Sequence, residues 1–250
     1  MSRIFLLIFA ALKFGKLSGT VITMLLSVGV YALIFGWRYA VGFIGLLLVH
    51  ELGHLIAARK RGLAVGLPTF IPFMGAWIEL KDLPHDAETE AFVGLGGPLL
   101  GTVGALACYF LARNYGVDWL LAVSYAGFFL NLFNMIPLSP LDGGRITAVL
   151  SPRIWLLGVP IFGLLLWYRF SPILVLVAIL AAPHVVAALR YRKDSPQAQT
   201  YYAVSARVRW EYGFIYIVLT AFLALMTHEV SQQLRGISRD DQTQSESGSV

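Results

Sequence analysis

Long apolar runs constrain the fold of this chain more than any other feature. A run of about 18 or more apolar residues with few charges is typical of a transmembrane helix, and several occur here. Hydrophobic residues make up 58% of the chain and charged residues only 13%, about half the charged share of soluble domains. The sequence therefore predicts an all-α polytopic membrane protein with about six to seven transmembrane helices. The candidate spans are residues 19–36, 40–59, 91–112, 117–137, 154–168, 171–190 and 212–227.

The basic residues predict the orientation of these spans. Most of the 19 Lys and Arg residues precede the first span or lie in the loops after the second, fourth and sixth spans. Because loops rich in Lys and Arg stay in the cytoplasm, we expect the N-terminus there and the chain in the inner or plasma membrane of a cell. The span 154–168 is short, and the side of the C-terminus depends on whether it crosses. Basic residues at helix ends account for the net charge of +5, so we do not expect nucleic-acid binding.

Two segments outside the spans have a composition of their own. Residues 63–90 are interrupted by Pro and Gly, and the stretch 69–80 is rich in aromatic and β-branched residues, which predicts a short β-hairpin or edge strand. Residues 228–250 are polar and rich in Ser, Gln and Asp, a composition typical of disorder. We therefore expect an integral membrane domain over residues 1–227 and a disordered tail over residues 228–250.

A metal-binding pattern lies at the end of the second span, in the sequence His50-Glu51-Leu-Gly-His54. Residues four apart lie on one face of a helix, so His50 and His54 can bind one metal ion. Glu51 lies beside them and can reach a metal-bound water, as in the His-Glu-x-x-His motif of zinc proteases. A charged residue in an apolar span costs free energy and usually serves a function. The alternative is that polar residues simply mark the end of the helix.

A catalytic zinc ion takes three protein ligands and keeps one position open for water, so one ligand is missing. The remaining histidines are poor candidates: His85 lies in a loop, His184 in an apolar run, and His228 at the other end of the last span. Asp118 falls on the outer side. Asp142 follows the fourth span, on the same predicted side as the two histidines, in a segment that prolines break. We therefore favour Asp142, although an ordinary turn aspartate is the alternative.

The two motifs together resemble the site-2 protease family of intramembrane zinc metalloproteases. The resemblance covers residues 40–150 and rests on the sequences His50-Glu51-Leu-Gly-His54 and Asn134-x-x-Pro137-x-x-x-Leu-Asp142-Gly. It implies that the two histidines and the aspartate bind one zinc ion per chain and that the glutamate is the catalytic acid and base.

The resemblance implies further roles beyond the metal ligands. Asn134 and Pro137 would support the substrate or the transition state. The family also tends to show Gly-Pro at the start of the intervening span, as in Gly97-Pro98 here. Gly97 and Gly101 form a Gly-x-x-x-Gly pair, which predicts close helix packing.

The function expected from these features is hydrolysis of peptide bonds in or near transmembrane segments of membrane proteins, as in regulated intramembrane proteolysis. The expected partners are a transmembrane protein substrate and the lipid bilayer. The sequence does not indicate the oligomeric state. Because a transmembrane helix shields its own carbonyls, the substrate must unwind, and the stretch 69–80 could then pair with it as an added strand. A catalytically inactive membrane scaffold of the same fold is the alternative. A cation transporter would need more acidic or histidine residues along the spans.

Overall fold

The computed structural model describes residues 15–73, 75–77, 82–168 and 170–247. Its longer helices are α2 (Gly15–Phe35), α3 (Trp37–Lys60), α4 (Ala87–Tyr115), α5 (Asp118–Asn134), α7 (Trp155–Tyr168), α8 (Pro172–Arg190) and α10 (Ala206–Ser247). The shorter ones are α6 (Asp142–Ala148), the 3₁₀ turn η1 (Pro152–Ile154) and α9 (Pro196–Tyr201). Each of the first six predicted spans coincides with one of the longer helices to within a few residues, and the seventh lies within α10. The predicted helical polytopic architecture is therefore confirmed.

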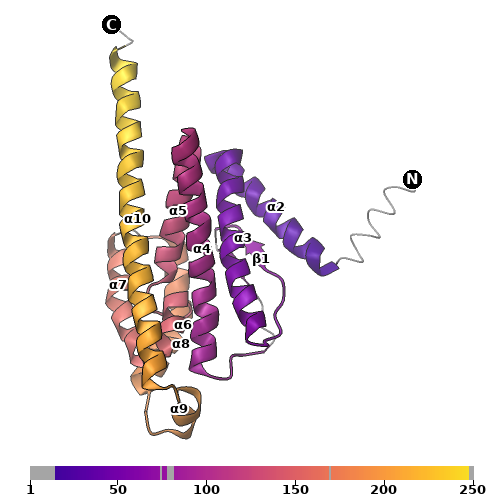
Figure 1. Cartoon of the computed structure of the whole chain (residues 1–250), viewed down its shortest axis with the longest axis vertical. Coiled ribbons are helices and arrows are strands. Elements are labelled where there is room, and N and C mark those ends of the chain that lie inside the picture. The colour runs from indigo at the N-terminus through magenta and orange to yellow at the C-terminus, as the bar shows by residue number, and fades with distance from the viewer. Residues whose placement is uncertain (1–14, 74, 78–81, 169, 248–250) are drawn as a thin grey trace, which may run out of the picture.

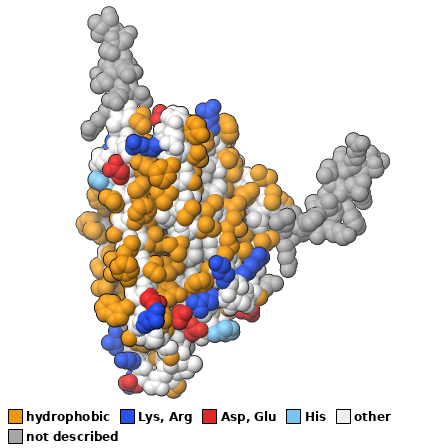
Figure 2. Space-filling model, viewed as in Figure 1, with side chains coloured by type: hydrophobic (Ala, Val, Ile, Leu, Met, Phe, Trp, Pro, Cys, Tyr) orange, Lys and Arg blue, Asp and Glu red, His pale blue; other side chains and the backbone are white. Residues whose placement is uncertain are grey.

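The surface of this bundle suits a membrane. Four helices are long and apolar enough to cross a bilayer: α3, α4, α8 and the part of α10 from Ala206 to Ile237. Two shorter apolar helices cover Gly19–Phe35 and Pro152–Tyr168. Figure 2 shows hydrophobic side chains over the middle of the visible face and charged side chains toward its two ends. Exposed apolar residues among those that the structure describes include Leu33 and Trp167, which are about nine-tenths exposed, so lipid rather than water suits this surface. The chain is an integral membrane protein.

Helices α3, α4 and α5 form the centre of the bundle and pack against one another. The backbones of α3 and α4 touch: a Cβ atom on Gly53 would lie 2.1 Å from the carbonyl oxygen of Gly96. Small residues permit such close approach between membrane helices. Helix α10 packs along α5 on the far side from α2, with Phe128, Leu219 and Leu223 in one buried cluster.

The predicted β-hairpin is confirmed. Strand β1 (Thr69–Ile71) pairs antiparallel with β2 (Gly75–Trp77). The hairpin is anchored by Phe70, which is 2% exposed and packs with Ile44 and Leu47 of α3. The Phe70 amide donates a hydrogen bond to Thr23 Oγ1 of α2 at 3.2 Å. Since that amide belongs to the outer edge of β1, helix α2 occupies this edge. Residues 78–80 of the predicted strand segment lie outside the described residues.

The segment after residue 227 differs from the expected tail. Helix α10 continues to Ser247, and Val230 is fully buried against the same cluster as Leu223. The Gln233 side-chain amide donates hydrogen bonds to Glu229 Oε1 and to the Tyr109 hydroxyl of α4. Apolar residues at helical spacing within a polar composition therefore continue the packing of α10 on α4, and composition alone did not indicate this.

Helix α9 connects α8 to α10 at the same end of the bundle as the start of α4 (Figure 1). The Tyr201 hydroxyl donates a hydrogen bond to Glu90 Oε2 at 2.7 Å. Burial, and then the negative charge of Glu90, raise the pKa of Tyr201 above its ordinary value, so the hydroxyl keeps its proton. On the other side of α4, Arg61 pairs with Glu88 at 3.0 Å. These contacts fix the polar end of α4.

Candidate metal centre

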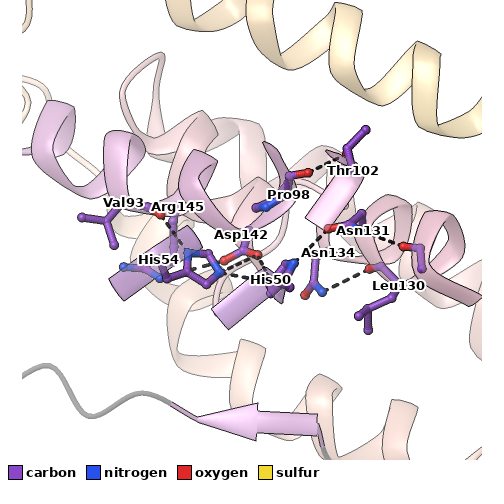
Figure 3. Close-up of polar contacts among 11 residues, drawn as sticks. His50, His54, Val93, Pro98, Thr102, Leu130, Asn131, Asn134, Asp142 and Arg145 are labelled. Atoms are coloured by element: carbon purple, nitrogen blue, oxygen red, sulfur yellow. Dashed lines mark hydrogen bonds and ion pairs between the residues drawn. The ribbon is translucent and has the colours of Figure 1, made fainter. Parts of the chain in front are cut away.

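Three side chains from two helices converge on one buried point (Figure 3). Asp142 Oδ2 lies 3.2 Å from His50 Nε2 and 3.2 Å from His54 Nε2. The two Nε2 atoms lie 3.1 Å apart. Among the residues that the structure describes, these three form the group of His, Cys, Asp or Glu side chains that could hold a metal ion. All three are buried.

The geometry of the cluster fits zinc. Ligand atoms about 2.0–2.1 Å from a tetrahedral zinc ion lie about 3.3 Å from one another, close to the three separations found here. Two imidazole nitrogens and one carboxylate oxygen also form a donor set that leaves one coordination position for water, as catalytic zinc sites do. Two nitrogen lone pairs directed at each other in a buried site would repel, and a cation between them removes that repulsion.

The orientation of His50 is fixed by a residue that sequence reasoning missed. Asn131 of α5 is 1% exposed, and its Oδ1 lies 2.9 Å from His50 Nδ1. The Asn131 amide nitrogen donates to the carbonyl oxygen of Gly127 at 2.7 Å, so its oxygen must face the imidazole. His50 therefore donates from Nδ1 and keeps the lone pair of Nε2 for a metal ion.

The imidazole of His54 is fixed in the same way by backbone. Its Nδ1 donates a hydrogen bond to the carbonyl oxygen of Val93 in α4 at 2.8 Å, which again leaves the Nε2 lone pair for a metal ion. Gly97 provides space for this ring, because a Cβ atom there would lie 2.2 Å from His54 Nε2. Gly101 provides space for Asn131, whose Oδ1 would lie 2.4 Å from an added Cβ atom. The Gly97 and Gly101 pair thus makes room for side chains of the site, and Gly53 and Gly96 make the helix contact.

Asp142 enters the cluster as the first residue of α6. The segment between α5 and α6 is folded tightly onto the start of α6: Gly143 lies against the carbonyl group of Met135. Trp155 Nε1 donates to the carbonyl oxygen of Gly144 at 2.8 Å. The second carboxylate oxygen of Asp142 lies 3.9 Å from the guanidinium of Arg145. Arg145 therefore lies against the carboxylate oxygen that does not face the histidines.

Glu51 lies in the same buried region. Its side chain is 8% exposed and interacts electrostatically with His54, His50 and Asp142. It is not one of the three grouped ligand residues. Both ligand histidines lie near it on the same helix, α3. This placement suits a group that exchanges protons with a bound water.

The two remaining predicted site residues lie beside the cluster. Asn134 is half-buried, and its amide nitrogen donates to the carbonyl oxygen of Leu130 at 3.1 Å. Figure 3 shows it on the same side of α5 as Asn131. The carbonyl of Pro137 packs closely against Gly158 of α7. Neither residue is grouped with the metal ligands, and their support of a substrate stays a prediction.

The other histidines lie apart from the cluster. The His184 ring packs edge-on against Trp155 with ring centroids 5.6 Å apart. Neither His85 nor His228 belongs to the metal-binding group found among the described residues. The three-ligand set predicted from the sequence is thus the set that the structure brings together.

Part of this chain is similar to a known peptidase family and to curated zinc metalloproteases. Residues 38–126 match the model of Peptidase family M50. Zinc metalloprotease MJ0392 of Methanocaldococcus jannaschii is 33% identical over 111 residues, covering 42% of this chain and 32% of that protein. Rip3 of Mycobacterium tuberculosis, whose name describes a zinc metalloprotease, is 34% identical over 137 residues, covering 48% of this chain and 33% of that protein. The matched region thus spans roughly a third of the length of these curated relatives.

One solved structure is also similar. The Site-2 Protease from Methanocaldococcus jannaschii is 20% identical with a TM-score of 0.44, covering 68% of this chain and 87% of that one. The family match includes His50, Glu51 and His54 but ends before Asp142. The family and relative matches confirm the resemblance to the site-2 protease family of zinc metalloproteases that the two sequence motifs indicate.

Proposed function

We propose that this chain is an intramembrane zinc metalloprotease that hydrolyses peptide bonds in or near the transmembrane segments of other membrane proteins. One observation carries the proposal: His50, His54 and Asp142 place three ligand atoms 3.1–3.2 Å apart inside a membrane helix bundle, with the Glu51 carboxylate buried beside them. The names of the relatives and the family match support the same reaction class.

The three ligand residues would hold one zinc ion through His50 Nε2, His54 Nε2 and Asp142 Oδ2. A bound zinc ion would supply an acidified water and polarise the carbonyl group that is attacked. The protein contributes the fixed orientation of each ligand: Asn131 and the Val93 carbonyl hold the imidazoles, and Arg145 lies against the other oxygen of Asp142. Fixed ligands retain the open position for water instead of closing around the ion.

Glu51 carries the proton transfers in this proposal. Its carboxylate accepts a proton from the attacking water and then delivers it to the nitrogen of the departing amine. Burial excludes bulk water, so the proton stays within the site between the two steps. Asn134 retains one amide hydrogen besides the one donated to Leu130, and this hydrogen is available to the substrate backbone.

The substrate must be unwound before its carbonyl group is reached, and the hairpin supports a way of holding it. A substrate strand would add to the sheet by main-chain hydrogen bonds. Because Thr23 of α2 already binds the outer edge of β1, the strand would pair with β2. Helix α3, which carries the two histidines, also packs against β2, so a strand held there lies near the metal ligands.

The distribution of basic residues supports an orientation for the site. We place the N-terminus and the metal-binding side in the cytoplasm of a cell with the chain in its inner or plasma membrane, because Lys60, Arg61 and Arg145 lie at that end of the helices. We assign catalysis to residues 40–150 and a supporting role to the helices that follow.

The direct test is Glu51→Gln in the full chain, purified in detergent and returned to vesicles with a transmembrane substrate. Zinc content should stay at one ion per chain while cleavage falls by about 100-fold or more. His50→Ala is the matched control and should lose the zinc as well as the cleavage. If the chain is an inactive scaffold, the unaltered protein cleaves none of the membrane substrates offered to it. If Glu51→Gln retains cleavage, the proposed role of Glu51 is wrong.

A further inference from the structure

We infer that helix α10, which lies outside the family match, is a clamp that positions the Asp142 carboxylate for metal binding. The inference rests on the proposed function, and it adds Tyr216 and Arg209 to the residues on which the site depends. Helix α10 contacts both α5 and α6, so it borders the segment that carries Asp142 on two sides.

The first contact is at the start of that segment. The Tyr216 hydroxyl donates a hydrogen bond to the carbonyl oxygen of Met135 at 2.5 Å. Helix α5 ends at Asn134, and the last carbonyl groups of a helix have no partner within it. Pro137 and Pro140, which follow, have no N–H group to offer. Tyr216 therefore satisfies a buried backbone acceptor where the helix breaks.

The same carbonyl group supports the residue next to Asp142. A Cβ atom on Gly143 would lie 2.2 Å from the Met135 oxygen, so the backbone of Gly143 rests directly on this carbonyl group. Contacts therefore run without a gap from Tyr216 through Met135 and Gly143 to Asp142. If the carbonyl group turned, the first turn of α6 would move, and the carboxylate would move with it.

The second contact is at the end of the segment. The Arg209 guanidinium donates to the carbonyl oxygen of Leu150 and to that of Tyr202, the latter at 2.8 Å. Leu150 in turn packs over Gly213 of α10. Two residues of α10, two turns apart on the helix, thus hold backbone acceptors on either side of α6. A helix of seven residues cannot fix its own direction, so this pair of contacts, together with the packing of α6 on α4, sets how α6 presents Asp142.

The test is a double-mutant cycle on zinc affinity in the full chain, measured by competition with a chelator in detergent. Tyr216→Phe removes only the hydroxyl, and affinity should fall about tenfold, the lower end of the cost of removing a supporting hydrogen bond at a metal site. In the Asp142→Ala background, the same change should alter affinity less than about twofold, because no carboxylate is left to position. Tyr212→Phe removes a hydroxyl one turn earlier on α10 and should leave affinity unchanged.

Equal losses with and without Asp142, or no loss in Tyr216→Phe, would overturn the clamp. A general loss of folding would lower affinity in both backgrounds and is thereby recognised. If Tyr216→Phe does not accumulate, Arg209→Lys enters the same cycle, since it keeps the charge and loses the forked donor. A chain that binds no zinc at all, or that cleaves substrate with Glu51→Gln, defeats the proposed function itself, whereas wild-type affinity in Tyr216→Phe defeats only the clamp.

Discussion

The side-chain oxygen of Asn131 lies 2.9 Å from Nδ1 of His50, on the opposite side of the imidazole from the nitrogen that faces Asp142. This relationship joins α5 to α3 across the core and fixes the protonated nitrogen of the ring. Because the Asn131 amide nitrogen is already bound to Gly127, the side chain cannot rotate to present its donor instead. The metal-binding tautomer of His50 is thus set before an ion arrives.

Asn131→Leu should therefore weaken zinc binding. The change leaves the Nδ1 hydrogen of His50 without an acceptor, and removing such a partner typically costs 10–100-fold in metal affinity. Chelator competition on the purified protein measures the effect. Asn134→Leu is the matched control on the same helix and should keep zinc affinity within about twofold. Equal zinc affinity in the two variants would show that Asn131 does not position His50.

Gly97→Ala should displace the second histidine. The added methyl group would lie 2.2 Å from His54 Nε2, so the ring must leave the ligand position, and zinc affinity should fall at least about tenfold. The accompanying overpacking should cost about 1–3 kcal/mol of stability. Gly45→Ala on α3 is the control, because nothing lies within 4 Å of its Cβ position. Full zinc content in the Gly97→Ala protein would contradict the packing described.

Metal removal should be reversible and should lower thermal stability. An ion that binds only the folded protein stabilises it by about 4 kcal/mol at a concentration 1,000 times its dissociation constant. Dialysis against a chelator should thus lower the melting temperature and stop cleavage, and added zinc should restore both. The His50→Ala protein should show no shift on zinc addition. A shift that persists in this variant would place the ion at another site.

Ala76→Pro should reduce cleavage while zinc content stays normal. The substitution removes an amide hydrogen of β2, the strand whose outer edge α2 does not occupy, and so prevents a substrate strand from pairing there. Leu83→Pro, in the exposed segment that follows the hairpin, is the control for adding a proline nearby and should leave cleavage intact. Unchanged turnover in Ala76→Pro would remove strand addition from the mechanism.

Cysteine labelling should report the proposed orientation. After Cys108→Ala removes the native thiol, Lys60→Cys should react with a membrane-impermeant maleimide only when cells are opened. Tyr115→Cys, at the other end of α4 and 74% exposed, should react in intact cells. The reverse pattern would place the metal site at the outer face and would contradict the orientation drawn from the basic residues.

The metal ligands could be predicted because their signals are local. His50 and His54 are four residues apart, which places them on one helical face whatever the rest of the chain does. Asp142 needed a second argument, since its partners lie far away in the sequence. The predicted membrane side and the broken segment after α5 supplied it. The hairpin was likewise indicated by its own composition.

The supporting contacts could not be predicted in this way. The Val93 carbonyl is a backbone group, and no side-chain pattern marks it. Asn131 did leave a signal in the sequence, a polar amide within an apolar helix. The supporting role was instead assigned to the nearby Asn134, because Asn134 belongs to the recognised motif. The contact between Gly53 and Gly96 joins two helices whose register is fixed only by packing. The sequence predicted that the last helix ends at residue 227. Polar residues surround the apolar positions beyond it, such as Val230, so the composition did not reveal that the helix continues.

The order of the ligands along the chain has a consequence for biosynthesis. Both histidines are in place once α3 has entered the membrane, but Asp142 follows only after α4 and α5 have been made and inserted. A nascent chain thus carries an incomplete ion site while helices α2 to α5 enter the bilayer. The proposed peptidase therefore cannot attack these four helices while they are being inserted, because the ligand that completes the site follows all of them along the chain.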